Sequence, residues 1–169
     1  QIFFQCIHLR IFIFLCLKNI ILMKIREAKI SDLENLSVLF NSYREFYGKK
    51  SDRLIAKEFI NSRITLGDSK IFICESNNDL IGFVQLYPIF SSTRVSKYWI
   101  LNDLFINKDF RGKGFSKLLI RRAQDLVIDS NACGMLLETE KTNTIGNKLY
   151  PSTGFKKYNQ SNFYEWIPN

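Results

Sequence analysis

Two glycines separated by one lysine, Gly112 and Gly114, stand between two apolar stretches of different period. The run that ends at Ile106 alternates like a strand, and the stretch from Phe115 onward repeats its apolar residues like a helix. A strand that enters a helix through glycines leaves unpaired N–H groups at the helix start, where an anion can approach the backbone. Residues 104–116 therefore predict a strand, a glycine loop and a helix that together suit a phosphate group.

The side chains of this loop support an anion site but match neither of two common phosphate-binding motifs. Arg111 and Lys113 add positive charge. The loop is not the dinucleotide fingerprint, because Lys117 stands where a glycine or alanine is needed, and it is not a P-loop, because no Gly-Lys-Ser or Gly-Lys-Thr ends it. Taken alone, the loop fits a plain tight turn as well as it fits an anion site.

The order of apolar patterns along the chain predicts the fold class. The expected strands cover residues 24–29, 71–75, 80–87, 97–107, 134–139, 155–158 and 163–167, and the expected helices cover 32–47, 52–66, 115–127 and 143–150. This order predicts an α/β fold: a single domain over residues 23–169 with a mixed, mostly antiparallel sheet and helices on both faces.

Two of these strands carry further expectations. Pro88 is expected to interrupt the strand that begins at residue 80, because proline has no N–H to donate to a neighbour. Strict alternation places one set of side chains from the strand 97–107 on a single face: Trp99, Leu101, Asp103 and Phe105. A bulge in that strand would mix the two faces.

Residues 1–22 differ in composition from the rest of the chain, since they hold no acidic residue, glycine or proline. Their longest apolar run, residues 11–17, is too short to span the roughly 30 Å hydrocarbon core of a bilayer. A signal peptide would need a small-residue cleavage site, which does not follow. We expect an extension upstream of a natural start at Met23, with an anchoring or partner-binding helix as the alternative. The only histidine of the chain, His8, lies in this extension.

Charge and cysteine content limit the partners. The formal net charge is +8, but basic residues are mixed with acidic ones and no RNA- or DNA-binding motif appears. An anionic cofactor explains the charge better, so we expect no nucleic acid and no membrane partner. The cysteines form no C-x-x-C pair, so we expect neither a metal site nor disulfides, and a reducing, cytoplasmic location fits best. Cys74 and Cys133 are expected to be buried core thiols.

Two motifs together carry a resemblance to a known family. Arg111-Gly-Lys-Gly-Phe-Ser116 resembles the R/Q-x-x-G-x-G/A pyrophosphate loop of the GNAT acetyltransferases, and about 30 residues later Asn143-Thr-Ile-Gly-Asn-Lys-Leu-Tyr150 followed by Gly-Phe resembles their N-x-x-A-x-x-L-Y segment. The resemblance covers nearly all of residues 23–167. The segments 43–48 and 85–92 look like a bacterial branch of unassigned substrate, near the polyamine and diamine acetyltransferases. Two positions depart from the motifs: Ser116 replaces the final small residue, and Gly146 replaces an alanine.

The resemblance implies an N-acetyltransferase that moves an acetyl group from acetyl-CoA directly to the primary amine of a small molecule, polyamine-like or amino-acid-like, in a ternary complex. Acetylation of a protein or peptide, and a non-catalytic fold that binds acyl-CoA, are the alternatives. No metal is implied, and a homodimer is compatible. The implied cofactor contacts come from the backbone of one strand, the glycine loop and the later helix: Leu104, Phe105, Ile106, Arg111, Gly112, Lys113, Gly114, Phe115, Ser116, Lys117, Asn143 and Tyr150.

The resemblance also suggests which residues act as the general acid and the general base. On spacing alone, a buried tyrosine packed on Phe155 is the better explanation of Tyr150, but the motif matches Tyr150 to the general acid of the family and favours that role. The acceptor amine, with a pKa of about 10.4, must lose a proton. With no histidine in residues 23–169, a carboxylate acting through water is the natural base. Asp103 is the first candidate and Glu138 the second. Asp103 has a purely structural alternative, a carboxylate hydrogen-bonded at a strand bulge.

Specificity is less constrained by the sequence. Polyamine acetyltransferases carry two acids where this chain has Asn102-Asp103, so a polyamine acceptor is in doubt. Tyr43, Tyr47 and Tyr87 are candidates for the acceptor mouth, together with Asp103. Tyr43 and Tyr47 also fall on the apolar stripe of a helix, so core packing is an equal alternative.

Overall fold

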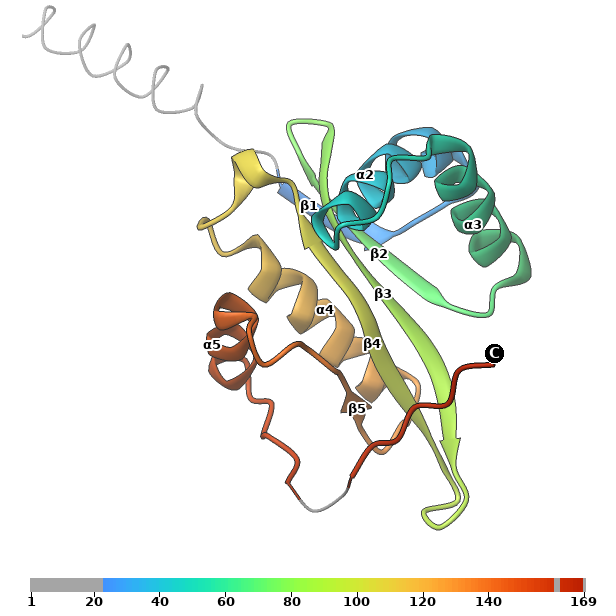
Figure 1. The fold of residues 1–169 in the computed structure, drawn as a ribbon, viewed down its shortest axis with the longest axis vertical. Helices are drawn as coiled ribbons and strands as arrows, with labels where there is room; N and C mark the ends of the chain where they lie inside the picture. The colour runs from blue at the N-terminus through green and yellow to red at the C-terminus, as the bar shows by residue number, and fades with distance from the viewer. Residues whose placement is uncertain (1–22, 160–161, 169) are drawn as a thin grey trace, which may run out of the picture.

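A computed structural model describes residues 23–159 and 162–168 (Figure 1). The expectations for residues 1–22, including His8 and the upstream extension, lie outside these residues. The sheet contains five strands in sequential order: β1 (Met23–Glu27), β2 (Lys70–Ser76), β3 (Asp79–Ser91), β4 (Ser96–Ile106) and β5 (Met135–Leu136). All neighbours are antiparallel except β4 and β5, which run parallel. The predicted mixed, mostly antiparallel sheet is confirmed.

Four α-helices accompany the sheet in the described part of the chain: α2 (Leu33–Phe46), α3 (Arg53–Leu66), α4 (Phe115–Asp129) and α5 (Thr144–Ser152). Short 3₁₀ turns precede α2 and α4, at η1 (Ile30–Asp32) and η2 (Lys108–Phe110). The helix ends follow local chemistry: Asp52 caps α3 by accepting the Ile55 N–H at 3.0 Å, and Gly67 ends α3 in the left-handed conformation. None of the described helices is long and apolar enough to cross a membrane.

The helices cover both faces of the sheet and build two cores (Figure 1). On one face, α2 and α3 pack Leu36, Phe40 and Ile60 against the strands. On the other, α4 buries its apolar stripe against β2, β3 and β4, and α5 lies at the margin of that core. The sheet is therefore buried on both sides, as predicted for helices on both faces.

The strand β4 does not keep its side chains on one face. Gln85 of β3 pairs with Asp103, and the next residue, Leu86, pairs with Leu101, so Asn102 is an extra residue without a partner across the ladder. This bulge reverses the alternation. Leu101 packs on the α4 side, whereas Phe105 packs on the α2–α3 side. The single face expected from strict period two is therefore wrong.

Pro88 does not interrupt β3, which continues to Ser91. The pairing of β2 with β3 ends at Lys70 and Leu86, so Pro88 has no β2 neighbour and needs no N–H to donate on that side. On its other side Pro88 lies opposite Trp99 of β4. The prediction of a break was wrong because the proline stands where the strand has become an edge.

The end of the sheet is shorter than expected. The strand expected at 134–139 is reduced to the two residues of β5, and residues 155–159 and 162–168 form no strand. Two residues of β5 present too short an edge for another strand to pair with. The apolar residues of the last segment are accordingly exposed: Phe163, Tyr164, Trp166 and Ile167.

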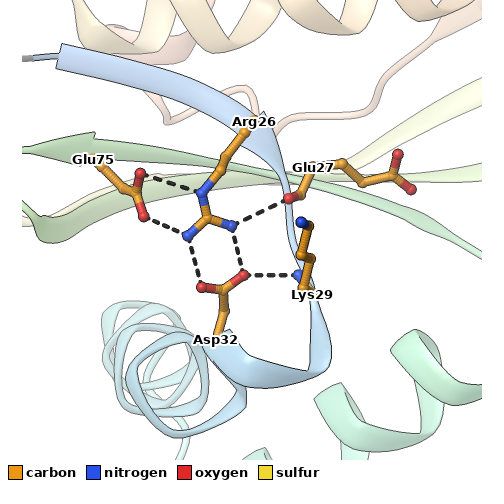
Figure 2. Close-up of polar contacts among 5 residues, drawn as sticks. All are labelled: Arg26, Glu27, Lys29, Asp32 and Glu75. Carbon is orange, nitrogen blue, oxygen red and sulfur yellow. Dashed lines mark hydrogen bonds and ion pairs between the residues drawn. The ribbon is translucent and has the colours of Figure 1, made fainter.

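An ionic cluster fastens β1 to its neighbours (Figure 2). The Arg26 guanidinium donates to both carboxylate oxygens of Asp32 at 2.7 Å, and to both oxygens of Glu75 on β2. Asp32 also accepts the backbone N–H of Lys29 at 2.7 Å, which closes the turn that leads into α2. One arginine thus joins the first strand, the second strand and the start of the first long helix.

We predict that Asp32→Asn lowers the free energy of unfolding by about 2 kcal/mol at pH 7, because it leaves Arg26 under-paired. The side chain of Asp32 is only 11% exposed, and its hydrogen bond with Arg26 lowers its pKa. A lowered pKa contributes stability that is complete above about pH 5 and is lost as the pH falls below about 4. Urea unfolding at several pH values should therefore show the two proteins converging in acid.

The matched control is Glu34→Gln, which also removes one carboxylate near the start of α2. Glu34 pairs with Lys57 but is 74% exposed, so its loss should cost less than about 0.5 kcal/mol. Equal effects of the two substitutions, or a difference between Asp32→Asn and the parent that persists unchanged to pH 3, would contradict the assigned role of the Arg26 cluster.

Candidate active site

Asp103 is a buried carboxylate just after the bulge of β4. It is 5% exposed, and both its oxygens accept from the Asn102 amide at 3.2 Å. The Tyr43 phenol of α2 hydrogen-bonds it from the facing helix. Burial raises the pKa of Asp103, and these two hydrogen bonds offset part of the rise. The arrangement suits a group that accepts a proton more readily than an ordinary surface aspartate.

Three tyrosines lie around this carboxylate, and a fourth lies next to them. The charge of Asp103 acts on Tyr43, Tyr47 and Tyr87, and Tyr47 in turn acts on Tyr150. Burial is the main cause that raises the pKa of each phenol, to about 12 for Tyr87. The structure therefore brings together four tyrosines and one aspartate that lie up to 107 residues apart in the sequence, and all four phenols are neutral at pH 7.

Packing and site chemistry are not alternatives for the tyrosines of α2. The Tyr43 ring contacts Phe83 and Phe105 edge to face, with centroids 5.7 and 6.0 Å apart, while its hydroxyl reaches Asp103. Tyr47 packs on Tyr43 at 5.0 Å and is about half exposed. The ring of Tyr43 therefore belongs to the core and its hydroxyl lies at the buried carboxylate, while a role in the acceptor site stays a prediction.

A pocket of ≈ 410 Å³ opens beside this centre. It lies between the end of α2 and the start of α5, and is lined by Phe46, Tyr47, Glu140, Thr142, Asn143, Thr144 and Ile145. Its wall combines aromatic rings from α2 with a carboxylate and an amide from the loop that follows β5. The charge of Glu140 reaches Tyr47 and contributes to the raised pKa of that phenol.

The glycine loop has the geometry expected of an anion site. Gly112 and Gly114 have φ angles of 76° and 84°, a left-handed conformation that favours glycine, and the space beside each is open. Gly114 caps α4 without any side-chain hydrogen bond, so the N–H groups of Phe115 and Ser116 are left uncapped at the positive end of the helix, while the Lys117 N–H donates to the Gly114 carbonyl at 3.0 Å. The side chain of Phe115 is buried in the core, which leaves only its backbone to the loop.

The two basic side chains of the loop are held back toward the protein. The Nε of Arg111 donates to the Ile106 carbonyl at 2.9 Å, and its guanidinium lies over the rings of Phe46 and Phe105 at 5.1 and 5.3 Å. Lys113 lies 5.2 Å from the centre of the Phe110 ring. Their positive charge remains near the loop, but an anion at the loop would meet the backbone N–H groups before these side chains.

One edge of β4 is open next to this loop. Along that edge, β4 pairs with β5 only at Trp99 and Ile100, so in the described residues no strand covers it from Leu101 to Ile106. The side chains of Phe105 and Ile106 are buried on opposite faces of the sheet. What residues 104–106 offer at this edge is therefore backbone, which suits an extended chain that carries amide groups, except that the Ile106 carbonyl already accepts from Arg111 Nε.

Asn143 caps the start of α5, and both atoms of its side-chain amide are hydrogen-bonded. Its Oδ1 accepts the Gly146 N–H at 2.9 Å, and its Nδ2 donates to Thr139 Oγ1 at 2.9 Å. A Cβ at position 146 would lie 2.7 Å from that Nδ2. The glycine that replaces the alanine of the motif thus makes room for this Asn143 conformation, in addition to its cost in helix propensity of about 1 kcal/mol.

Glu138 and the two cysteines of the described chain, Cys74 and Cys133, were also assigned roles or environments by the sequence. Glu138, the second candidate base, is exposed in the segment after β5. Cys74 is buried and burial raises its pKa to about 11, as expected of a core thiol, but Cys133 is exposed. The prediction for Cys133 was wrong because the strand expected around it is reduced to two residues. Its backbone pairs with Lys97, about 20 Å along β4 from Asp103, so Cys133 lies away from the carboxylate.

The sequence analysis missed two residues of this region. Glu140 lines the pocket, and Gln85 lies directly across the ladder from Asp103. Gln85 had a usable signal, because it shares a strand face with Phe83 and Tyr87 at period two. Glu140 stands in a loop, where no periodic pattern assigns a direction. Among the described residues, no group of three or more His, Cys, Asp or Glu side chains is arranged to hold a metal ion.

Comparisons with known proteins agree with this geometry. The family model for the acetyltransferase (GNAT) family matches residues 34–155. An uncharacterized N-acetyltransferase of Bacillus subtilis, YhfO, is 41% identical over 80% of this chain and 91% of its own length, and a probable acetyltransferase of Haemophilus influenzae is 28% identical over 85% and 97%. A solved structure of a probable acetyltransferase superposes with a TM-score of 0.82 at 30% identity, covering 86% of this chain and 98% of that one.

The fold and the open β4 edge beside a glycine loop define an acyl-CoA-dependent transferase. The chain belongs to the GNAT family of acetyltransferases, and it is an acetyl-CoA-dependent N-acetyltransferase. Acetyl-CoA is the co-substrate of that family. The residues present fit it, because the outward N–H groups before α4 match a pyrophosphate and the open edge of β4 matches an extended amide arm.

Proposed function

We propose that this enzyme transfers the acetyl group of acetyl-CoA directly to the primary amine of a small molecule, with Asp103 as the base and Tyr150 as the acid. The observation that carries the proposal is the buried Asp103 among phenols, next to the open edge of β4. A buried carboxylate with a raised pKa is a proton acceptor of the kind that an ammonium substrate needs.

The proposed cofactor contacts use the backbone groups of the glycine loop and of the free β4 edge. The N–H groups from Gly112 to Ser116 would hold the pyrophosphate, with Arg111 and Lys113 adding charge around it. The Lys117 N–H donates to the Gly114 carbonyl at 3.0 Å, so Lys117 would contribute through its side-chain charge. The backbone of residues 104–106 would pair with the pantetheine arm and place a donor at the thioester oxygen, where negative charge develops. Asn143 at the start of α5 would contact the same arm, and the adjoining pocket would receive the end of the cofactor or the acceptor.

An ammonium substrate loses two protons from its nitrogen as it becomes an amide, and the departing thiolate takes up one proton. The amine nitrogen forms a bond to the acetyl carbon, and the carbon–sulfur bond breaks. Asp103, directly or through water, takes the first proton, which frees the amine to attack. Tyr150 gives its phenolic proton to the departing sulfur, and the second nitrogen proton goes to the Tyr150 phenolate, which restores the acid. The Tyr150 pKa is raised by burial, so the phenol holds its proton at pH 7. Glu138 remains the second candidate for the base.

The acceptor is proposed at the level of a class. One distant relative, 23% identical over 141 residues, is a thialysine N-epsilon-acetyltransferase of Sus scrofa, and its name specifies the terminal amine of an amino-acid-like molecule. The acidic pair of the polyamine enzymes is incomplete here, since Asn102 hydrogen-bonds Asp103 where a second acid would stand. We therefore place amino-acid-like amines ahead of polyamines. A peptide N-terminus is the alternative acceptor.

The proposed function predicts that purified protein releases free CoA from acetyl-CoA when a suitable amine is added. The thiol is measured with a colorimetric reagent across polyamines, amino acids, aminoglycosides and peptide N-termini. Turnover of at least one small primary amine well above the rate without an amine is expected. Binding of CoA without thiol release for any small amine, with release for peptides alone, would replace the proposal by its alternative.

The assignment of Asp103 predicts a specific pH profile. Because its raised pKa makes the basic form disappear at a higher pH than for an ordinary aspartate, kcat/KM should fall in the acidic range along a limb that belongs to Asp103. Asp103→Asn should lower kcat by about 10²- to 10⁴-fold and remove that limb. Glu138→Gln serves as the matched control. Loss of the limb in Glu138→Gln and its retention in Asp103→Asn would transfer the role of the base to Glu138.

The assignment of Tyr150 predicts that Tyr150→Phe lowers kcat by about 10²-fold or more, with the affinity for CoA and the thermal stability nearly unchanged. The ring still packs on Phe155, with centroids 5.9 Å apart, so only the hydroxyl is lost. Tyr158→Phe, at an exposed position, is the control for the same chemical change. An unchanged kcat, or a loss of stability in place of a loss of rate, would show that Tyr150 is only a packing residue.

A further inference from the structure

Gln85 is an amide buried in the centre of the sheet. It is 0% exposed and lies across the ladder from Asp103. Its Nε2 donates to Ser69 Oγ at 2.8 Å and to Tyr87 Oη at 3.0 Å. Its Oε1 is buried and has no hydrogen-bond partner within residues 23–159 and 162–168.

Stability alone does not explain this residue. The neighbouring strand positions Val84 and Leu86 are buried and apolar. A buried acceptor without a donor costs roughly 1–3 kcal/mol, and an apolar side chain of the same volume would avoid that cost. An amide retained at such a position therefore points to a task performed by its Nε2, which faces Tyr87.

The hydrogen bond from Gln85 fixes the role of the Tyr87 hydroxyl. A phenol has one proton to donate and an oxygen that accepts. Because Nε2 occupies the oxygen, the phenol contributes its own proton, and no described residue accepts that proton. Tyr87 is half-buried, on the face of the sheet that carries Asp103. The remaining charged groups that act on it are Arg63 of α3 and Asp68 of the loop after α3, which form an ion pair at 2.7 Å.

We propose that Gln85 makes Tyr87 a hydrogen-bond donor in the acceptor site, and that this donor selects amines which carry an oxygen acceptor, such as a hydroxyl, carbonyl or carboxylate, close to the nitrogen. The inference rests on the proposed function in one respect, the position of the acceptor beside Asp103. An ammonium group can only donate, so it pairs with Asp103 and gains nothing from Tyr87. An oxygen two or three bonds away supplies the acceptor that the Tyr87 proton lacks.

A donor of this kind discriminates strongly. A site that holds a polar group for hydrogen bonding to the substrate rejects analogues without that bond, since they leave the group unpaired. Plain alkylamines and polyamines are such analogues, because they offer no oxygen. Gln85 acts as a positioning residue here, and Tyr87 makes the contact.

The test uses ethanolamine and propylamine, which differ only by a hydroxyl in place of a methyl group. The ratio of their kcat/KM values is measured for the parent protein, Tyr87→Phe and Gln85→Met. Their different basicity affects every variant equally, so changes in the ratio isolate the contact with the protein. We expect the preference for ethanolamine to fall about ten-fold in both variants, the size of one hydrogen bond. A ratio that Tyr87→Phe leaves unchanged overturns the proposal.

Val84→Ala is the matched control, because Val84 is the strand neighbour of Gln85 and packs on the opposite face. It should lower the thermal stability and leave the ratio unchanged, so an equal fall in Val84→Ala would assign the effect to destabilisation and overturn the proposal. Should Gln85→Met not fold, Tyr87→Phe decides the outcome, since it keeps the half-buried ring.

The two proposals fail in different ways. If both amines release CoA but their ratio is insensitive to Tyr87, the specificity inference is wrong and the proposed function stands. If no amine releases CoA, the proposed function fails. In that case the ratio is taken from dissociation constants of the two amines for the CoA-saturated protein, measured by calorimetry. No preference for ethanolamine, or a preference that Tyr87→Phe leaves unchanged, overturns the inference there too.

Discussion

The extra residue in β4 is the constraint on which the rest of the site depends. Asn102 has no partner across the ladder, so the side chains before and after it point to opposite faces. If β4 continued from Leu101 in regular alternation, with Asn102 paired in the ladder, Asp103 would lie on the same face as Leu101 and would face α4 and its apolar core. With the bulge, Asp103 turns toward α2, where Tyr43 meets it. Asn102 also supplies an amide to the carboxylate, so the bulge both directs and stabilises the charge that it introduces into the sheet.

The two ends of β4 differ in how their edges are paired. At its start, β4 is paired on both edges and the sheet is continuous. Toward Ile106 one edge is free, and the chain continues into a loop whose glycines expose backbone N–H groups. Arg111 is tied back to the Ile106 carbonyl at this junction. An extended acyl-CoA needs both features in a row, because its arm pairs with an edge and its phosphates need donors.

Much of the fold follows from local patterns. The expected helix 52–66 and the expected strands 71–75 and 80–87 lie close to α3, β2 and β3, since the residues at their ends, Asp52, Gly67 and the asparagines of the β2–β3 turn, act through the local backbone. The errors arose where the outcome depends on a neighbour. Pro88 is tolerated because β2 has already ended, and the apolar segment near Trp166 forms no strand because β5 offers no adequate edge. Neither fact is visible in the segment itself.

The sequence by itself determined the order of helices and strands, the glycine loop and the family, because each depends on short-range periodicity or on closely spaced motif residues. It also identified Asp103 and Tyr150 as candidates. Only the tertiary structure decided which side chains meet: Tyr43 and Tyr87 come from two elements, and their approach to Asp103 depends on the direction set by the bulge. It likewise revealed Gln85, since the role of a buried amide depends on which groups its two ends reach.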